Sequence, residues 1–275
     1  MLKFLTKAII FLGVIVGAIT FVYLYDLYQE IKDDIDSVVN YNPKQSTQFF
    51  DKNGKLLANT FKDENREYVN YDDIPARVIE GLVAIEDTQF FEHFGVNPDA
   101  ISRAVIKNIQ SGGYSEGAST LTQQLIKVLL LSREKKIIRK VKEALLAIRL
   151  ETVLTKEEIL ERYLNHVYFG HGYYGVKTAA KGYFKKNLYE LTLKEIAILV
   201  GLPRAPSFYD PTKNLQVSLA RANQVITRMH TLGWINNEQF EESINETPTI
   251  YNQTLTQNIA PYAIDYAVSE LVNDI

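Results

Sequence analysis

Two acidic residues, Glu86 and Asp87, stand side by side in the stretch AIEDTQFFEHFG. A helix over residues 78–93 would place Glu86 in a stripe of apolar residues at three- and four-residue spacing. The other members of that stripe are Ile79, Leu82, Val83 and Phe90. Asp87 would then be turned about 100° away from Glu86. A carboxylate on a core-facing stripe is costly unless it is paired or has a function, so the spacing singles out Glu86 as a candidate acid or base.

A second candidate cluster lies in the stretch REKKIIRKVKEALLAIRLE, which covers residues 133–151. On a helix, Arg139 and Lys140 both reach the carboxylate of Glu143, because they precede it by four and three residues. The cluster is either a solvated salt-bridge face, the commoner meaning of such spacing, or an anion clamp in which the cations bind a phosphate. The same periodicity predicts a buried apolar stripe made of Ile138, Val141, Leu145 and Ile148.

A third candidate lies in the stretch SEGASTLTQQLIK, residues 115–127, where uncharged polar side chains crowd the start of a helix. They are Ser119, Thr120, Thr122, Gln123 and Gln124, with Lys127 one turn further on. Serine and threonine cap helix N-termini, and the free amides there attract anions. Plain capping requires one hydroxyl, so capping and anion binding both remain open.

Several kinds of chemistry have no support in the sequence. There is no cysteine, which excludes a thiolate nucleophile, a Cys-ligated zinc site and a disulfide framework. The four histidines, His93, His166, His171 and His230, do not form an HExxH spacing, so no certain metal site is predicted. The net charge of −3 gives no reason to expect a nucleic-acid partner.

The elements that must position these residues begin with an uncharged run over residues 8–25, AIIFLGVIVGAITFVYLY. A membrane-spanning helix needs roughly 17–25 such residues. Lysines precede the run and acidic residues follow it, which places residues 1–7 in the cytoplasm and the rest outside. The alternative, a cleaved signal peptide, would have a shorter apolar core and a small-residue cleavage site. We therefore expect an uncleaved single-pass anchor.

Beyond the anchor, turn and capping signals divide the chain into elements. The stretch FFDKNGKLLANT, with Asn53-Gly54 as its turn, predicts a β-hairpin. From Pro75 onward the pattern is mostly helical, with a capping box over residues 192–195 and a helix end at Gly201. The glycine- and tyrosine-rich residues 168–175 predict a tight, aromatic-lined loop.

Five segments, taken in order, resemble one family. They read ED-x-x-F-x-x-H-x-G at residues 86–95, G-x-S-T-x-T-Q-Q at 117–124, R-K-x-x-E at 139–143, and two longer stretches at 156–184 and 191–211. These motifs are similar to those of the peptidoglycan glycosyltransferase domain (glycosyltransferase family 51), found in class A penicillin-binding proteins and in monofunctional transglycosylases. The resemblance covers roughly residues 46–230. Lys185 and Val200 depart from it, standing where the family usually has glycine and alanine.

The resemblance implies a mainly α, lysozyme-like glycosyltransferase domain with an N-terminal transmembrane helix and a small β-hairpin linker. The expected organisation is a cytoplasmic tail at 1–7, the anchor at 8–25, a juxtamembrane spacer and hairpin linker at 26–65, the glycosyltransferase domain at 66–245, and the start of a linker to a missing transpeptidase domain at 246–275. K-T-G does not occur, so the S-x-x-K, S-x-N and K-T-G set of a transpeptidase is incomplete and no transpeptidase chemistry is expected here. Residues 51–54 and the tail at 258–272 resemble the linker parts of bifunctional class A proteins, so a truncated bifunctional synthase is expected. Residues 101–117 are expected to form a mobile jaw that dips toward the bilayer.

For the chemistry, the resemblance implies polymerisation of lipid II with inversion at the anomeric centre. Glu86 would be the general base that deprotonates the acceptor's 4-hydroxyl, and its core-facing position predicts a raised pKa. Glu143, with Arg139 and Lys140, would handle the diphosphate leaving group, which favours the clamp over the salt-bridge face. The other residues expected to contact or support substrate are Asp87, Phe90, Arg103, Ser119, Gln123, Gln124 and Lys127.

The resemblance also implies partners and a location. We expect lipid II, the growing glycan strand, the lipid bilayer and cell-wall synthesis proteins as partners, at the bacterial cytoplasmic membrane with the catalytic domain outside. No cofactor is expected to be required, although a divalent cation, Mg²⁺ or Mn²⁺, at the diphosphate remains open. Two rival hypotheses are a lytic hydrolase of the same fold class, which would not need the cations of the clamp, and an inactive membrane adaptor, which would not need Glu86 and Glu143.

Overall fold

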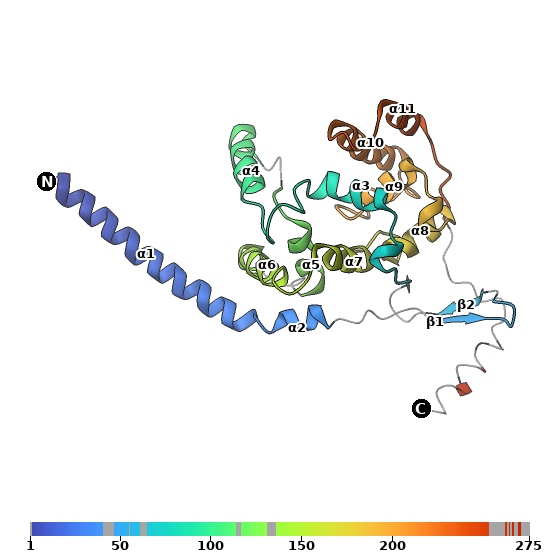
Figure 1. The fold of residues 1–275 in the computed structure, drawn as a ribbon, viewed down its shortest axis with the longest axis horizontal. Helices are drawn as coiled ribbons and strands as arrows, with labels where there is room; N and C mark the ends of the chain where they lie inside the picture. The colour runs from blue at the N-terminus through green and yellow to red at the C-terminus, as the bar shows by residue number, and fades with distance from the viewer. Residues whose placement is uncertain are drawn as a thin grey trace. The chain divides into compact units, whose positions relative to one another are not determined.

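The computed structural model describes residues 2–40, 47–54, 56–60, 65–113, 117–130 and 136–252, and positions 262, 264, 266, 269 and 270. Within these ranges helices predominate and strands are short (Figure 1). The expected mainly α class, with an N-terminal helix and a small β-hairpin, is confirmed. The chain divides into two compact units, each made of two separate stretches: a first unit of Met1–Tyr41 and His93–Thr155, and a second unit of Asn42–Glu92 and Lys156–Ile275.

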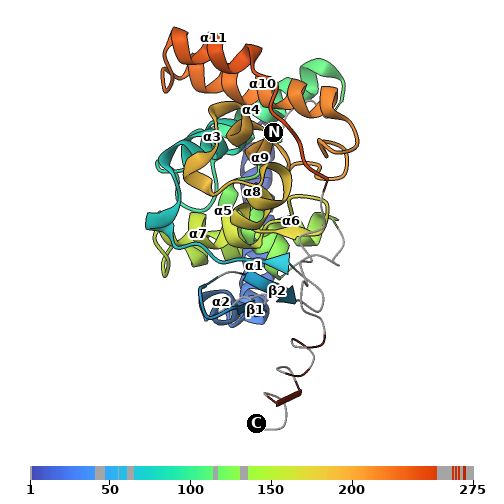
Figure 2. The same cartoon turned by 90° about the vertical axis from the view of Figure 1, so that its right-hand side faces the viewer.

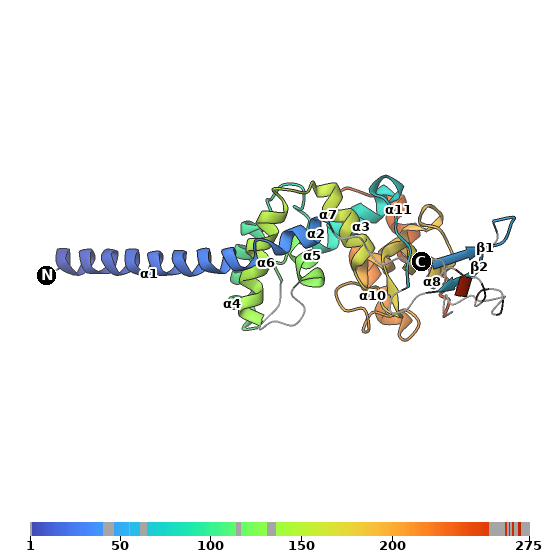
Figure 3. The same ribbon diagram turned by 90° about the horizontal axis from the view of Figure 1, so that it is seen from below.

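The first unit begins with α1 (Leu2–Ile31), one unbroken helix in Figure 3. Its segment Ile9–Ile31 is long and apolar enough to cross a membrane, because its most apolar window has a mean hydropathy of 2.1 and no buried residue. This agrees with the expected anchor. The other helices of the unit are α2 (Asp34–Val39), α4 (Pro98–Ser111), α5 (Leu121–Leu129) and α6 (Lys136–Leu150).

Helix α6 packs with a different face from the one that its periodicity predicts. Ile138 and Ile148 of the predicted buried stripe are 40% and 38% exposed, whereas Leu146, Ala147 and Leu150 are fully buried. The prediction of that stripe is therefore wrong. The physical reason is that α6 contacts α5 and also the α1–α2 segment, and an apolar stripe in a sequence does not specify which neighbours a helix will meet.

The second unit opens with the hairpin of β1 (Thr47–Phe50) and β2 (Leu56–Thr60), which pair antiparallel. Gly54 has a φ of +79° in the connecting turn, so the predicted hairpin and its turn residue are confirmed. A second, parallel pair joins β3 (Asn65–Arg66) to β4 (Tyr173–Tyr174).

The helical part of the second unit comprises α3 (Ala76–Glu86), α7 (Lys156–His166), α8 (Val176–Phe184), α9 (Leu193–Gly201), α10 (Leu215–Thr231) and α11 (Asn237–Asn245), with short 3-10 turns at Tyr71–Asp73 and Leu188–Glu190. Helices α3, α9 and α10 contact one another and form the core of the unit. In Figure 2, α10 and α11 lie side by side next to α9. The capping box at Thr192 and the end of α9 at Gly201 agree with the sequence signals.

A short segment after the hairpin is fastened to α7. The carboxylate of Glu161 accepts hydrogen bonds from the Tyr68 hydroxyl and from the Tyr71 amide, which lies 2.6 Å away. The side chain of Asn165 both accepts from and donates to the backbone of Val69. These bonds fix α7, and with it Tyr163, in the interior of the unit.

The loop over residues 168–175 is tight, as expected. Gly170, Gly172 and Gly175 have φ angles of +88°, +79° and +84°, and His171 between them has a φ of +53°. Lys185, one departure from the family pattern, ends α8 with a φ of +55°, a left-handed conformation that glycine adopts without strain. Its ammonium lies 4.2 Å from the centre of the Tyr251 ring, a contact that a glycine there would lack.

Candidate functional site

The first candidate cluster begins where α3 ends. The helix stops at Glu86, because Asp87 has a φ of −158° and leaves the helical conformation. The predicted continuation of this helix to residue 93 is therefore wrong. The Asp87 amide still donates to the Val83 carbonyl, and the Asp87 carbonyl accepts from the Phe90 amide, so a turn replaces the expected helix.

The carboxylate of Glu86 faces inward, as the periodicity predicts. Its side chain is 10% exposed, and Oε1 lies 3.2 Å from Nη2 of Arg221, whose side chain is 5% exposed. Burial lowers the pKa of Arg221, and the negative charge of Glu86 opposes that effect. Glu86 is therefore a largely buried carboxylate with a buried cation beside it.

Aromatic side chains surround this ion pair. The Arg221 guanidinium lies 5.7 Å from the centre of the Tyr209 ring. Burial, reinforced by the nearby charge of Glu86, raises the pKa of Tyr163 well above its ordinary value of 10. The Tyr163 hydroxyl therefore stays neutral beside Glu86. It can take part in hydrogen bonds, but it does not release its proton.

Two further predicted residues, Asp87 and Phe90, are buried in the same unit. The Phe90 ring lies 4.4 Å from the ammonium of Lys156 at the start of α7. Such a contact between a cation and an aromatic face is worth about 1 kcal/mol and fixes the ring. Their burial favours a role in holding the turn that follows Glu86.

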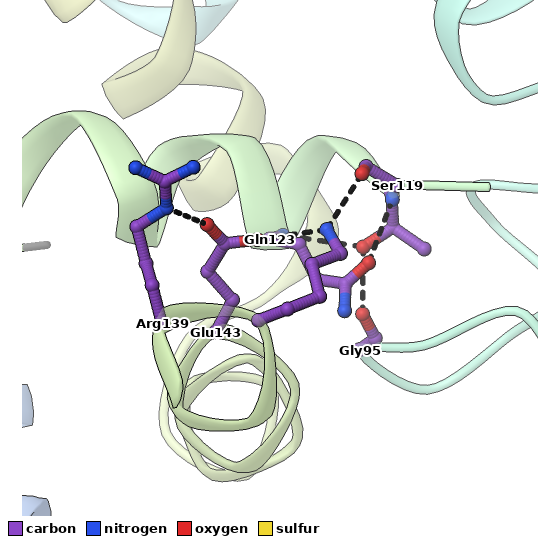
Figure 4. A network of polar contacts seen from close by, with 7 residues as sticks. Gly95, Ser119, Gln123, Arg139 and Glu143 are labelled. Atoms are coloured by element: carbon purple, nitrogen blue, oxygen red, sulfur yellow. Dashed lines mark hydrogen bonds and ion pairs between the residues drawn. The ribbon is translucent and has the colours of Figure 1, made fainter. Parts of the chain in front are cut away.

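The second candidate cluster lies on α6, in the first unit (Figure 4). Glu143 has a side chain that is 4% exposed, and its two oxygens are separately paired. Oε1 lies 3.3 Å from Nε of Arg139, and Oε2 lies 2.7 Å from Nζ of Lys140. The same Lys140 ammonium donates to the Ser119 hydroxyl at 2.6 Å, so it connects the second and third motifs. We call these four side chains, Ser119, Arg139, Lys140 and Glu143, the cation cluster.

The cation cluster has an electrostatic property suited to anions. One buried carboxylate holds two cations, so the cluster carries a net charge of about +1. Arg139 and Lys140 remain partly exposed to solvent, while the buried carboxylate of Glu143 holds them in place. An incoming diphosphate would meet donors that are already oriented, which is the arrangement that stabilises developing negative charge.

The start of α5 is capped by Thr120. Its hydroxyl accepts from the Gln123 amide, and Oε1 of Gln123 accepts from the Thr120 amide, which completes a capping box. Gln123, expected to bind substrate, therefore also has a capping role. The Thr120 hydroxyl in turn donates to the Gly95 carbonyl at 2.7 Å, so the end of the first motif is attached to α5 (Figure 4).

Three more predicted substrate-binding residues belong to the first unit. Arg103 is exposed on α4, Lys127 is exposed on α5, and Gln124 is half-buried on the first turn of α5. Within the described residues, no group of three or more histidine, aspartate or glutamate side chains is arranged to hold a metal ion. The expected jaw and the C-terminal linker fall partly outside those residues.

Arg221 is the residue of this site that sequence reasoning missed. It lies 135 positions after Glu86, on a helix that carried no candidate motif. No periodicity or capping pattern joins two residues so far apart. The available signal was indirect. A core-facing carboxylate requires a cationic partner, and a cation on an otherwise apolar helix face is a candidate for that partner.

Comparison with known proteins places these clusters in a family. The transglycosylase family model matches residues 53–230. Penicillin-binding protein 1A of Aquifex aeolicus is 40% identical over 264 residues, which are 95% of this chain and 36% of that protein. Penicillin-binding protein 1A of Escherichia coli is 39% identical over 254 residues, which are 91% of this chain and 30% of that protein.

A solved structure is also similar. The crystal structure of penicillin-binding protein 1A from Haemophilus influenzae aligns with 85% of this chain and 25% of that chain, at 26% identity and a TM-score of 0.47. The chain spans about a third of the length of the curated relatives it matches. The family match covers both clusters, from Glu86 and Arg221 to the residues of α6. The chain belongs to the transglycosylase family, the family that its sequence motifs indicate.

Proposed function

We propose that this chain is a membrane-anchored peptidoglycan glycosyltransferase that polymerises lipid II into β-1,4 glycan strands. The reaction inverts the anomeric centre and releases undecaprenyl diphosphate. The observation that carries the proposal is the cation cluster, in which a buried Glu143 holds Arg139 and Lys140 ready for an anion. A glycan hydrolase does not release a diphosphate and has no need of such a cluster.

The proposed reaction is one displacement. Glu86 takes the proton from the 4-hydroxyl of the acceptor sugar as that oxygen attacks C1 of the donor sugar. The bond between C1 and the diphosphate oxygen breaks, and the diphosphate leaves with the electron pair. Arg139 and Lys140 stabilise the charge that develops on it. Attack from the face opposite the leaving group converts the α linkage into a β linkage.

Arg221 supports this role of Glu86. A base must be ionised before it can accept a proton, and burial disfavours the ionised form. The guanidinium 3.2 Å away favours the carboxylate and holds it in one orientation. We therefore propose Arg221 as a positioning residue for the base.

The remaining predicted residues receive roles that follow their exposure. Arg103 and Lys127, which are exposed, are proposed to bind the diphosphate, and the half-buried Gln124 with the buried Gln123 to bind the sugar. We propose that no cofactor is required. Because Glu143 already holds two cations, a bound Mg²⁺ or Mn²⁺ would take its oxygen ligands from the diphosphate.

The location follows from the same proposal. We propose that α1 spans the bacterial cytoplasmic membrane with residues 1–7 in the cytoplasm and the transglycosylase domain outside. Both proposed sugar substrates are lipid-linked, so an anchored enzyme meets them at the membrane surface. The growing strand and cell-wall synthesis proteins are the proposed partners.

The test is incubation of the purified, detergent-solubilised chain with lipid II, followed by gel separation of glycan strands. Wild-type protein is expected to give a polymer ladder, and Glu86→Gln none, although the variant still unfolds cooperatively in urea, at a lower midpoint because Arg221 loses its buried partner. Glu80→Gln is the matched control, because Glu80 lies on the same helix in a partly exposed pair with Arg77. A ladder from Glu86→Gln would overturn the base assignment. Cleavage of finished strands without synthesis would favour the hydrolase.

A further inference from the structure

The C-terminal end of the anchor helix has buried apolar residues, whereas the preceding part of the helix is exposed. Phe21, Tyr23 and Tyr25 are exposed, as a lipid-facing surface would be. Four later apolar residues are buried: Leu27, Ile31, Ile35 and Val38. Their spacing of four, four and three residues continues one stripe from α1 into α2, although the helices are separate. We call these four residues the anchor seam.

The partner of this segment within the first unit is α6. Both α1 and α2 contact α6. Lys142 of α6 is buried, with its side chain 9% exposed, and its ammonium lies 3.3 Å from the carboxylate of Glu30 on α1. The Glu30 side chain is 66% exposed, so the pair lies at the edge of the contact between α1 and α6, where it orients the buried lysine.

Helix α6 also carries most of the cation cluster. Glu143 directly follows Lys142, and Lys140 precedes Lys142 by two positions, which is about 200° around the helix. One face of α6 is thus in contact with the anchor segment, while the other presents Lys140 toward Ser119. A helix held on one face by a fixed contact cannot rotate or slide without moving the groups on the other.

We propose that the anchor seam and the Glu30–Lys142 pair are positioning elements for the cation cluster, so that the membrane helix and the diphosphate-binding cations move as one body. The inference rests on the proposed function. Glu30 lies about 8 Å along the helix axis beyond Tyr25, at 1.5 Å per residue. The attachment therefore places the cations a fixed, short distance from the membrane surface, where a lipid-linked diphosphate lies.

The experiment compares variants of the full chain in lipid II turnover. Glu30→Gln and Lys142→Met each remove one partner of the contact. Both are expected to lower kcat/KM about tenfold, chiefly through a higher KM, because displaced cations bind the diphosphate less well. The double variant Glu30→Leu with Lys142→Met replaces the ion pair by an apolar contact and is expected to restore most of the activity. Asp26→Asn, an exposed charge one turn earlier on α1, is expected to behave like the wild type.

A second measurement does not depend on activity. Hydrogen exchange of the α6 amides is expected to rise in both single variants and to return in the double variant. Wild-type kinetics and wild-type exchange in Glu30→Gln and Lys142→Met would overturn the inference. Failure of the wild type itself to polymerise lipid II would instead overturn the proposed function, so the two failures are distinguishable.

Discussion

A general base inside a protein meets two opposing requirements at the level of single residues. It must be shielded so that its proton affinity is useful, and it must still be ionised when the substrate arrives. As the proposed base, Glu86 would meet the first through burial and the second through Arg221. The neutral Tyr163 hydroxyl beside it adds no competing charge.

The contribution of Arg221 can be measured from the pH dependence of turnover. In Arg221→Met, Glu86 loses the charge that favours its ionised form, so it stays protonated up to a higher pH. The acid limb of the kcat/KM profile is therefore expected to move to higher pH, with activity at pH 7 at least tenfold lower. Arg221→Lys should keep most of the wild-type profile. A profile for Arg221→Met that overlays the wild type would contradict the role.

Arg228→Met is the matched control for that measurement. Arg228 lies two turns further along α10 and is exposed, with its guanidinium 3.1 Å from the Thr88 hydroxyl. The variant removes the same charge from the same helix without touching Glu86. Its acid limb is expected to coincide with that of the wild type.

A second residue-level prediction concerns stability. Burial lowers the pKa of His166 to about 4 from its ordinary 6.5, partly opposed by its hydrogen bond to the Arg162 carbonyl. Between these two values the unfolded chain binds the proton and the folded protein does not, so stability falls as the pH falls from 6.5 toward 4. The contribution is about 3 kcal/mol. Urea unfolding of His166→Gln is expected to show a shallower decline, and His230→Gln the wild-type decline; equal slopes for all three would refute the assignment.

What the sequence could predict about single residues depended on local spacing. Glu86 faces inward because of residues within one helix, and Glu143 meets Arg139 and Lys140 because of positions three and four apart. Arg221 could not be predicted, because its meeting with Glu86 requires α3, α9 and α10 to be packed first.

At the level of elements, Gly95 sets how closely two segments approach. A Cβ at this position would lie 2.6 Å from the backbone of Ala147 in α6, and the φ of +75° is itself unfavourable for other residues. Gly95→Ala is therefore expected to destabilise the protein by about 3 kcal/mol. Its carbonyl also accepts from Thr120, so the variant should weaken the attachment of α5 as well. Urea unfolding in detergent measures the loss.

The matched control is Gly112→Ala at the end of α4. Gly112 has a similar φ of +66°, but a Cβ there would meet no atom within 4 Å. It isolates the backbone cost, which is expected to be about 1 kcal/mol. Equal losses in the two variants would mean that the close approach of Gly95 to α6 contributes nothing.

Features of an element that depend on a few adjacent residues could be predicted from the sequence. Features that depend on packing against other elements could not. The hairpin turn at Gly54 and the capping box at Thr192 depend on a few adjacent residues. The buried face of α6 was predicted wrongly, because contacts with both α5 and the anchor segment select it. The end of α3 at Glu86 was missed, because a turn around Asp87 carries Phe90 into the core without a helix.

At the level of the whole molecule, the fixed anchor predicts that activity depends on the distance between the membrane surface and the anchor seam. Insertion of four alanines between Tyr25 and Asp26 adds about 6 Å to α1 and about 40° of net rotation, while the anchor seam is left unchanged. Polymerisation is expected to fall severalfold in lipid vesicles and to change little in detergent micelles, which have no fixed surface. Insertion of four alanines after Gly17, within the exposed apolar segment, controls for helix length alone, because it leaves the region from Tyr25 onward unchanged and keeps the apolar run within the length of a membrane span. Equal vesicle rates for the insertion variant and the wild type would contradict the prediction.

Each unit is assembled from two separate stretches, so the growing chain passes from one unit to the other after residues 41, 92 and 155. The first unit has all its residues once residue 155 has been made. Glu86, in contrast, awaits a partner 135 residues later, an interval of about ten seconds at ordinary rates of synthesis. A chain released before residue 221 would therefore carry the anchor and the cation cluster but a proposed base without its guanidinium. Under the proposed mechanism, the order of biosynthesis would complete the leaving-group side of the enzyme first and the proton-accepting side last.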